Sequence, residues 1–237
     1  MVVVKYFLYF LIYSFIGWLM EVICKAIQFK RFVNRGFLIG PLCTIYGFGV
    51  LGIILLVGNP DQNIFVIFIK SIVICSILEY FTSYFMEKIF NTRWWDYSSK
   101  KFNINGRICL GTMLPFGILG TMVVYFLHPM IVRLVDLVPS NIQVILAIFL
   151  GVLFIIDNII SYVVMFKIKG EINKEKKDNT EYVREEVFNF LANNSILYRR
   201  IKNSYPNLVI RLKKIKKELE DKGESIKTSC EDFMKKH

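Results

Sequence analysis

Residues 30–49 read KRFVNRGFLIGPLCTIYGFG, and this stretch decides how the chain is laid out. Cationic side chains stand at its start, and Gly and Pro residues follow directly within membrane-length apolar sequence. Residues 91–117, NTRWWDYSSKKFNINGRICLGTMLPFG, have a similar composition. We call these stretches the first neck (30–49) and the second neck (91–117). Their Gly and Pro residues permit either close helix packing or a broken helix.

Composition places the chain in a membrane. Of its 237 residues, 54% are hydrophobic and 15% aromatic. The apolar residues cluster in runs of about 20, the length that crosses a hydrocarbon core of about 30 Å as a helix. We therefore predict an all-α transmembrane domain over 1–166, beginning with an uncleaved first span and followed by a tail over 167–237. The five predicted spans are 2–23, 38–57, 64–86, 108–132 and 142–166.

The distribution of Lys and Arg predicts the orientation. Both necks and the tail are basic, whereas the connections after the second and fourth spans hold only Arg133 between them. Basic residues near span ends favour the cytoplasmic side. The N-terminus is therefore expected outside and the C-terminus in the cytoplasm.

A weak internal repeat links the two necks. Aligning VNRGFLIGPLC at 33–43 with INGRICLGTML at 104–114 matches Asn34 with Asn105 and Gly40 with Gly111. This pattern predicts a parallel duplication of a two-helix hairpin, with the fifth span added. Parallel repeats are a common construction in transporters.

The tail over 167–237 has apolar residues at helical spacing in two blocks separated by Asn203-Ser204-Tyr205-Pro206. This spacing predicts two amphipathic helices that form a cytoplasmic hairpin or a short coiled coil. The basic stretch RLKKIKK favours contact with anionic lipid headgroups instead. Both interpretations stay open.

Carboxylates inside the spans are the first candidates for function, because buried charge in a membrane is costly. Glu79 and Asp157 are predicted at similar depth on the cytoplasmic side of the midplane, with Ser83 and Asn158 near them. In one interpretation they line a cavity that binds a cation, a proton or a polar substrate. In the other, neck arginines neutralise them and the pairs only join helices. Glu21, nearer the boundary, fits the second interpretation better.

The necks supply the second group of candidates. Arg guanidinium groups suit phosphate and carboxylate, while Trp prefers the membrane interface. One interpretation is a site for a lipid headgroup or an anionic substrate, and the other is simple anchoring at the cytoplasmic surface. The candidates are Arg35, Arg93, Arg107, Trp94 and Trp95.

Missing motifs narrow the function. The sequence has no P-loop, no GxSxG and no HExxH motif, so we expect no ATP hydrolysis by the chain itself and no catalytic residues. Five cysteines without a CxxC spacing support neither a disulfide framework nor a zinc site. We expect no cofactor and no metal. The net charge of +11 is assigned to anionic lipid rather than to nucleic acid.

Four ordered motifs carry a family resemblance. They are YSFIGWLMEV at 13–22, RFVNRGFLIGPLCTIYGFG at 31–49, EYFTSYFMEKIFNTRWWDYS at 79–98 and FNINGRICLGTMLPFGILG at 102–120. Together they resemble the putative ABC-transporter permease family of the CmpB type, over roughly residues 5–165. Thr44 departs from the family pattern, which has Pro there. The resemblance implies a multi-pass protein of the bacterial cell membrane with a permease role, and it implies no particular substrate.

Three functions follow as hypotheses. The first is a permease subunit of an ABC-type transporter, energised by a separate ATPase and completed by a second copy or a partner permease. The second is an integral-membrane enzyme or lipid-handling protein that binds an anionic headgroup at the cytoplasmic interface. The third is a membrane scaffold or regulatory protein that acts through its basic tail.

Overall fold

The computed structural model describes residues 1–174 except 31, 33, 35, 58–62 and 91–92. The predicted tail helices beyond residue 174 and the candidate residue Arg35 lie outside the described residues. The interpretations placed on them therefore stay predictions.

Among the described residues, four helical segments are long and apolar enough to cross a membrane, in agreement with the prediction of a multi-pass helical protein. Such segments can bury their whole backbone hydrogen-bond ladder within lipid. They are α1 (Val2–Phe29), α3 (Ile64–Phe90), the continuous run of α4 (Leu110–Met122), η1 (Val123–Leu127) and α5 (His128–Asp136), and α6 (Ser140–Lys174).

The second predicted span is shorter than expected. α2 covers Thr44–Val57, a length of 14 residues. At 1.5 Å per residue this is about 21 Å, less than the hydrocarbon core of about 30 Å. Residues 38–43, predicted as helix, are irregular backbone. Pro41 explains the difference, because it has no N–H and disfavours the helical conformation at Gly40 before it.

A short hairpin in the second neck corrects the expectation of a purely helical fold. β1 (Asn103–Ile104) pairs antiparallel with β2 (Ile108–Cys109). Between the strands, Asn105 and Gly106 have φ of 51° and 65°. Asn and Gly are the residues that adopt this left-handed conformation most readily. The hairpin delays the next helix to Leu110, two residues after the predicted start of the fourth span at 108.

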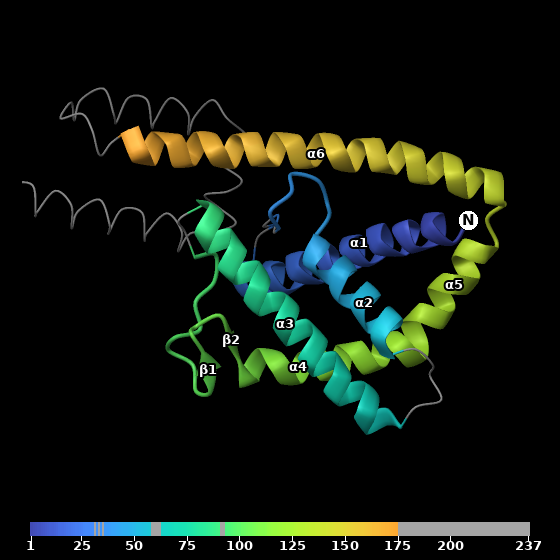
Figure 1. The fold of residues 1–237 in the computed structure, drawn as a ribbon, viewed down its shortest axis with the longest axis horizontal. Helices are drawn as coiled ribbons and strands as arrows, with labels where there is room; N and C mark the ends of the chain where they lie inside the picture. Colours follow the sequence, from blue (N-terminus) through green and yellow to red (C-terminus); the bar gives the residue numbers. More distant parts are fainter. Residues whose placement is uncertain (31, 33, 35, 58–62, 91–92, 175–237) are drawn as a thin grey trace, which may run out of the picture.

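The fourth predicted span changes direction within the membrane-length segment (Figure 1). It was predicted over 108–132, and its last helix, α5, continues to Asp136. The wide turn η1 ends immediately before His128 and Pro129. Proline cannot donate a backbone hydrogen bond, so the regular ladder is interrupted there.

Close approach at glycine joins the helices in two pairs, α1 with α2 and α3 with α4. A Cβ atom at Gly17 of α1 would overlap the ring of Tyr46 in α2. One at Gly120 of α4 would overlap Ser71 of α3. A Cβ atom at Gly117, in the second neck, would overlap the ring of Phe68 in α3, so this glycine serves close packing, one of the two uses expected for it.

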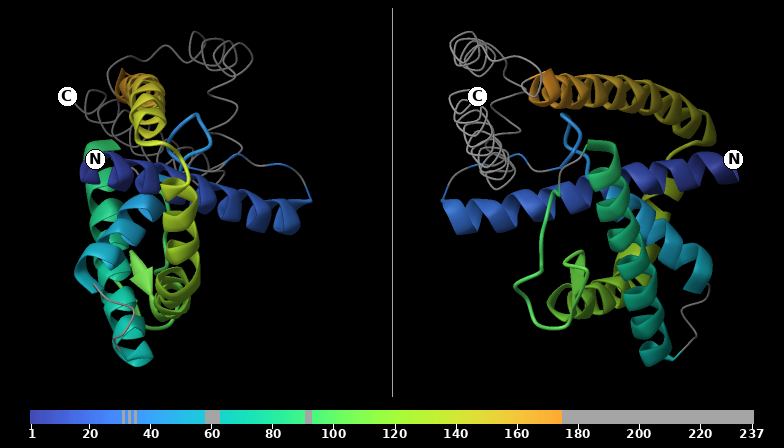
Figure 2. Two further views of the ribbon diagram at one scale, coloured as in Figure 1. Left: turned by 90° about the vertical axis from the view of Figure 1, so that its right-hand side faces the viewer. Right: turned by 60° about the vertical axis from the view of Figure 1, so that its left-hand side comes forward.

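The remaining helices close around these pairs. Figure 1 shows α6 along one side of the molecule and α4 along the opposite side, with α1, α2 and α3 between them, and Figure 2 shows the same order from other directions. The N-terminus lies beside α5 and the start of α6, where Lys5 Nζ is 2.5 Å from Asp136 Oδ1. The hairpin lies at the other end.

A buried cluster joins α1, α5 and α6 through Leu8, Tyr9, Tyr13, Ile131, Val135 and Ala147.

Candidate functional site

Glu79 is the most deeply buried carboxylate among the described residues of the spans. It lies in α3, two residues beyond the central residue Ile77, and its exposed fraction is 7%. Its Oε1 atom accepts a hydrogen bond from the Tyr97 hydroxyl at 3.5 Å. Its Oε2 atom has no hydrogen-bond partner within the described part of the chain. This oxygen is therefore buried without a hydrogen bond from the described residues.

Tyr97 connects the buried acid to the hairpin at the end of the molecule. Its backbone N–H donates to the carbonyl of Gly106 at 2.8 Å, which fixes its position beside the turn. Burial, with a smaller effect of the Glu79 carboxylate, raises the pKa of Tyr97 well above its ordinary value. The phenol thus keeps its proton at neutral pH and acts as a donor.

Glu21 of α1 is a second carboxylate near Glu79. It accepts a hydrogen bond from the Tyr46 hydroxyl of α2 at 2.8 Å. Its charge is close enough to interact with Glu79. Side chains from α1, α2, α3 and the second neck therefore meet around two carboxylates and two phenols.

Asp157 of α6 belongs to a different network. Its carboxylate accepts the backbone N–H of Ile39 at 2.9 Å and that of Gly40 at 3.0 Å. The Ser161 hydroxyl, one turn further along α6, lies 3.4 Å from the same carboxylate and accepts from Ile39 at 3.2 Å. Asp157 therefore holds the irregular segment before α2. Its neighbour Asn158 donates to Phe154 O at 2.7 Å within α6.

The backbone of the segment held by Asp157 makes hydrogen bonds to the neighbouring helices and to Asn34. The Cys43 N–H donates to Ser14 O of α1 at 2.9 Å, and the Asn34 side chain donates to Ile39 O at 3.3 Å. Asn34 also accepts from Trp18 Nε1 at 2.7 Å. Irregular backbone at membrane depth is tolerated only where protein or a polar cavity satisfies it. Here α1 and α6 do so.

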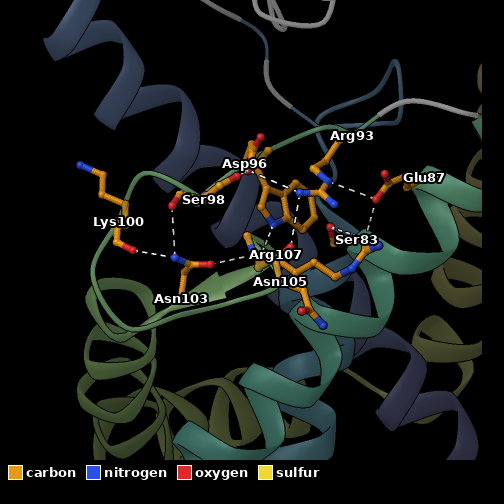
Figure 3. A network of polar contacts seen from close by, with 11 residues as sticks. Ser83, Glu87, Arg93, Asp96, Ser98, Lys100, Asn103, Asn105 and Arg107 are labelled. Atoms are coloured by element: carbon orange, nitrogen blue, oxygen red, sulfur yellow. Dashed lines mark hydrogen bonds and ion pairs between the residues drawn. The ribbon is translucent and has the colours of Figure 1, made fainter.

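The predicted neck arginines join the second neck to the end of α3 (Figure 3). Glu87 Oε2 lies 3.1 Å from Arg93 Nε and 2.8 Å from an Arg107 terminal nitrogen. Arg107 also donates to Ser83 at 3.3 Å and lies over the Tyr84 ring at 5.4 Å. Both guanidinium groups are thus paired with Glu87, and they join the second neck to α3.

The hairpin is further stabilised by its own polar side chains (Figure 3). Asn103 donates from its amide to Lys100 O at 2.8 Å and accepts from the Gly106 N–H at 2.9 Å. Asp96 accepts from the Ser98 hydroxyl and from the Ser98 N–H. Residues 93–109 therefore form a structural unit rather than a simple connection.

The two predicted tryptophans have different positions. Trp95 Nε1 donates to Arg107 O at 2.9 Å and so belongs to the hairpin. Trp94 packs edge-on against Phe37 and Phe90, with ring centroids 5.9 and 6.4 Å away. Phe37 also contacts Tyr162 of α6 at 4.9 Å, so this aromatic cluster joins both necks to α6.

Sequence reasoning missed the partners of the acids. Tyr46 and the backbone of Ile39 and Gly40 were not among the candidates, and Tyr97 was not linked to Glu79. The signals that pointed to them were weak: a phenol inside the motif IYGFG, another after the Trp pair, and the Gly-Pro step at 40–41. The predicted grouping of Glu79 with Asp157 does not appear, because each has separate partners.

Comparison with known proteins gives one match. The family model described as putative ABC-transporter type IV matches residues 8–162. This region includes both necks, all three candidate carboxylates and the segment held by Asp157. No curated protein and no solved structure shows a significant match to the chain.

Proposed function

Since this chain belongs to the family of putative ABC transporters of type IV, we propose that it is the permease subunit of an ABC-type transporter, energised by a separate ATPase. The match over residues 8–162 carries this proposal. The irregular segment before α2 supports it, because transporters often place discontinuous helices beside their pathway.

The proposal includes five spans in a bacterial cell membrane, with the N-terminus outside and the C-terminus in the cytoplasm. Helix α2 is the short fifth member. The arrangement in Figure 1 supports this orientation, since the hairpin and the end of α6 lie at the end of the molecule opposite to the N-terminus. The basic residues of both necks then face the cytoplasm, as the charge rule requires.

A parallel duplication of a two-helix hairpin is part of the same proposal. The residues that the repeat aligns have similar contacts: Asn34 bonds Trp18 of α1 at 2.7 Å, and Asn105 bonds Tyr80 of α3 at 2.9 Å. Each Asn thus joins a neck to an aromatic residue of the helix before it. These paired contacts support a common origin for the two halves.

The hairpin in the second neck is the docking element that we propose for the ATPase. It is held rigidly by Glu87, Arg93 and Arg107. At its surface it presents Lys100, Lys101 and Phe102, and the exposed fraction of Phe102 is 78%. An ordered apolar side chain within a basic rim is the kind of anchor that protein interfaces use.

Isolation from native membrane tests the proposal. We expect a complex with an ATPase subunit that is lost on the double substitution Phe102→Asp and Lys101→Glu. The control is Leu137→Asp, a residue with 79% exposure at the opposite end of the molecule, which should leave the complex intact. Absence of any ATPase from the wild-type preparation contradicts the proposal.

A further inference from the structure

Among the described residues, Glu79 accepts a hydrogen bond from Tyr97 at one oxygen, and its other oxygen has no partner. Glu87 pairs with two arginines, Asp136 pairs with Lys5, and Asp157 accepts two backbone N–H groups. In the part of the chain that the structure describes, no Lys or Arg forms an ion pair with Glu79. An isolated charge of this kind is costly to bury, and such groups are normally neutralised by a partner.

The surroundings of Glu79 supply oxygen atoms and negative charge rather than positive charge. Ser76, one turn earlier on α3, is 6% exposed, and its hydroxyl has no hydrogen-bond partner among the described residues. Thr112 of α4 lies close to Glu79, but its hydroxyl proton is directed to Cys109 O at 2.9 Å. Oxygen ligands around a carboxylate are the groups that hard cations prefer.

The titratable side chains that interact with Glu79 are Glu21 from α1, Tyr46 from α2, Cys75 from α3 and Tyr97 from the second neck, while Cys109 lies beside Tyr97. None of these side chains carries a positive charge. Arg107 donates to Ser83, one turn further along α3, but it is paired with Glu87. The nearby Glu21 carboxylate makes the place more favourable for a cation.

We propose that Glu79 is the anionic group of a binding site for a small monovalent cation, either a proton or an alkali-metal ion. Tyr97 provides the ligand from the second neck, so the bound cation stabilises the neck in its observed position. The inference goes beyond the permease proposal, because cation binding here needs neither an ATPase nor a transported substrate.

The test uses the full chain in nanodiscs of neutral phosphatidylcholine, as wild type and as Glu79→Gln. The melting temperature is measured in NaCl, KCl or N-methylglucamine chloride at one pH and ionic strength. Infrared difference spectra between acidic and alkaline buffer report a protonated carboxyl group. An alkali-ion site gives a higher melting temperature in NaCl or KCl, and a proton site gives a carboxyl band. Either signal must disappear in Glu79→Gln.

The control Asp136→Asn changes an exposed carboxylate at the opposite end of the molecule and should retain the signal. If Glu79→Gln does not fold, Tyr97→Phe serves instead. Loss of one charge-assisted hydrogen bond should weaken apparent cation affinity about tenfold or shift the carboxyl band. Absence of both signals in wild type, or signals unchanged in the variants, overturns the inference. The double variant Phe102→Asp and Lys101→Glu, which should lose the ATPase, should retain the cation signal, and this outcome separates the test from that of the permease proposal.

Discussion

Asp157 and Glu79 are both carboxylates in apolar helices, but the protein surrounds them differently. Asp157 lies opposite an irregular stretch of backbone whose N–H groups point at it from 2.9 and 3.0 Å. Glu79 lies within regular helix, with one phenol at 3.5 Å and one oxygen unpartnered among the described residues. The first carboxylate is satisfied by the fold, and the second is not.

The difference indicates which acid is structural. A buried group with all its hydrogen bonds made stabilises the arrangement that makes them. A buried group left partly unsatisfied costs stability, and it persists where it has another use. Asp157 should therefore matter to folding and Glu79 to ligand binding, and the following variants test that contrast.

The largest effect is expected for Asp157→Leu. It leaves the N–H groups of Ile39 and Gly40 without their acceptor at membrane depth, so the free energy of unfolding should fall by about 2–5 kcal/mol. Denaturation in mixed micelles measures it. Asn158→Leu is the matched control, since its amide donates to Phe154 O within its own helix. Equal losses for both variants contradict a structural role for Asp157.

Gly40→Ala tests the same contact from the other side. A Cβ atom there would lie 2.8 Å from Asp157 Oδ2, so the two must separate. We expect a loss of about 1–3 kcal/mol in the free energy of unfolding, typical of overpacking. Gly49→Ala should be neutral or stabilising, because its nearest contacts would be at 3.6 Å and alanine favours helix. Identical stability of the two variants refutes the close contact.

Glu87→Gln removes the acid that joins the two neck arginines. Its side chain is 34% exposed, so solvent screening limits the expected loss of stability to under about 1 kcal/mol. The local effect should be clearer, as faster hydrogen exchange in residues 93–109. Lys88→Gln, at the adjacent position, should leave exchange in this loop unchanged. Unaltered exchange in Glu87→Gln shows that the loop is held by other contacts.

Glu79→Gln should have the smallest effect on folding. It replaces an incompletely paired carboxylate by a neutral group of the same shape, so the free energy of unfolding should stay within about 1 kcal/mol of wild type or rise. The same micelle denaturation measures it. A loss as large as that of Asp157→Leu removes the distinction between the two acids.

The apolar helices and the acids within them were predictable from sequence, because a long apolar run is a local property. The irregular backbone at residues 38–43 was not predicted, although the Gly40-Pro41 step disfavours a continuous helix there. The sequence there stays apolar. Hydropathy does not distinguish a helix from an irregular segment whose backbone hydrogen bonds are made by neighbouring helices.

The partners of the acids were beyond sequence reasoning for a different reason. Glu79 and Asp157 were grouped by their similar depth, but depth does not reveal which direction a side chain takes around its helix. The contact between Gly40 and Asp157 joins residues 117 positions apart. Only the packing of α6 against the first pair of helices brings them together.

That long-range contact also sets an order of events during synthesis. The α1–α2 and α3–α4 pairs join neighbours in sequence and can form as soon as each pair has left the ribosome. The backbone at Ile39 and Gly40 must wait for Asp157, which is translated 117 residues after Gly40. Until α6 enters the membrane, these N–H groups need water or the insertion machinery, so completing the first half depends on the arrival of α6.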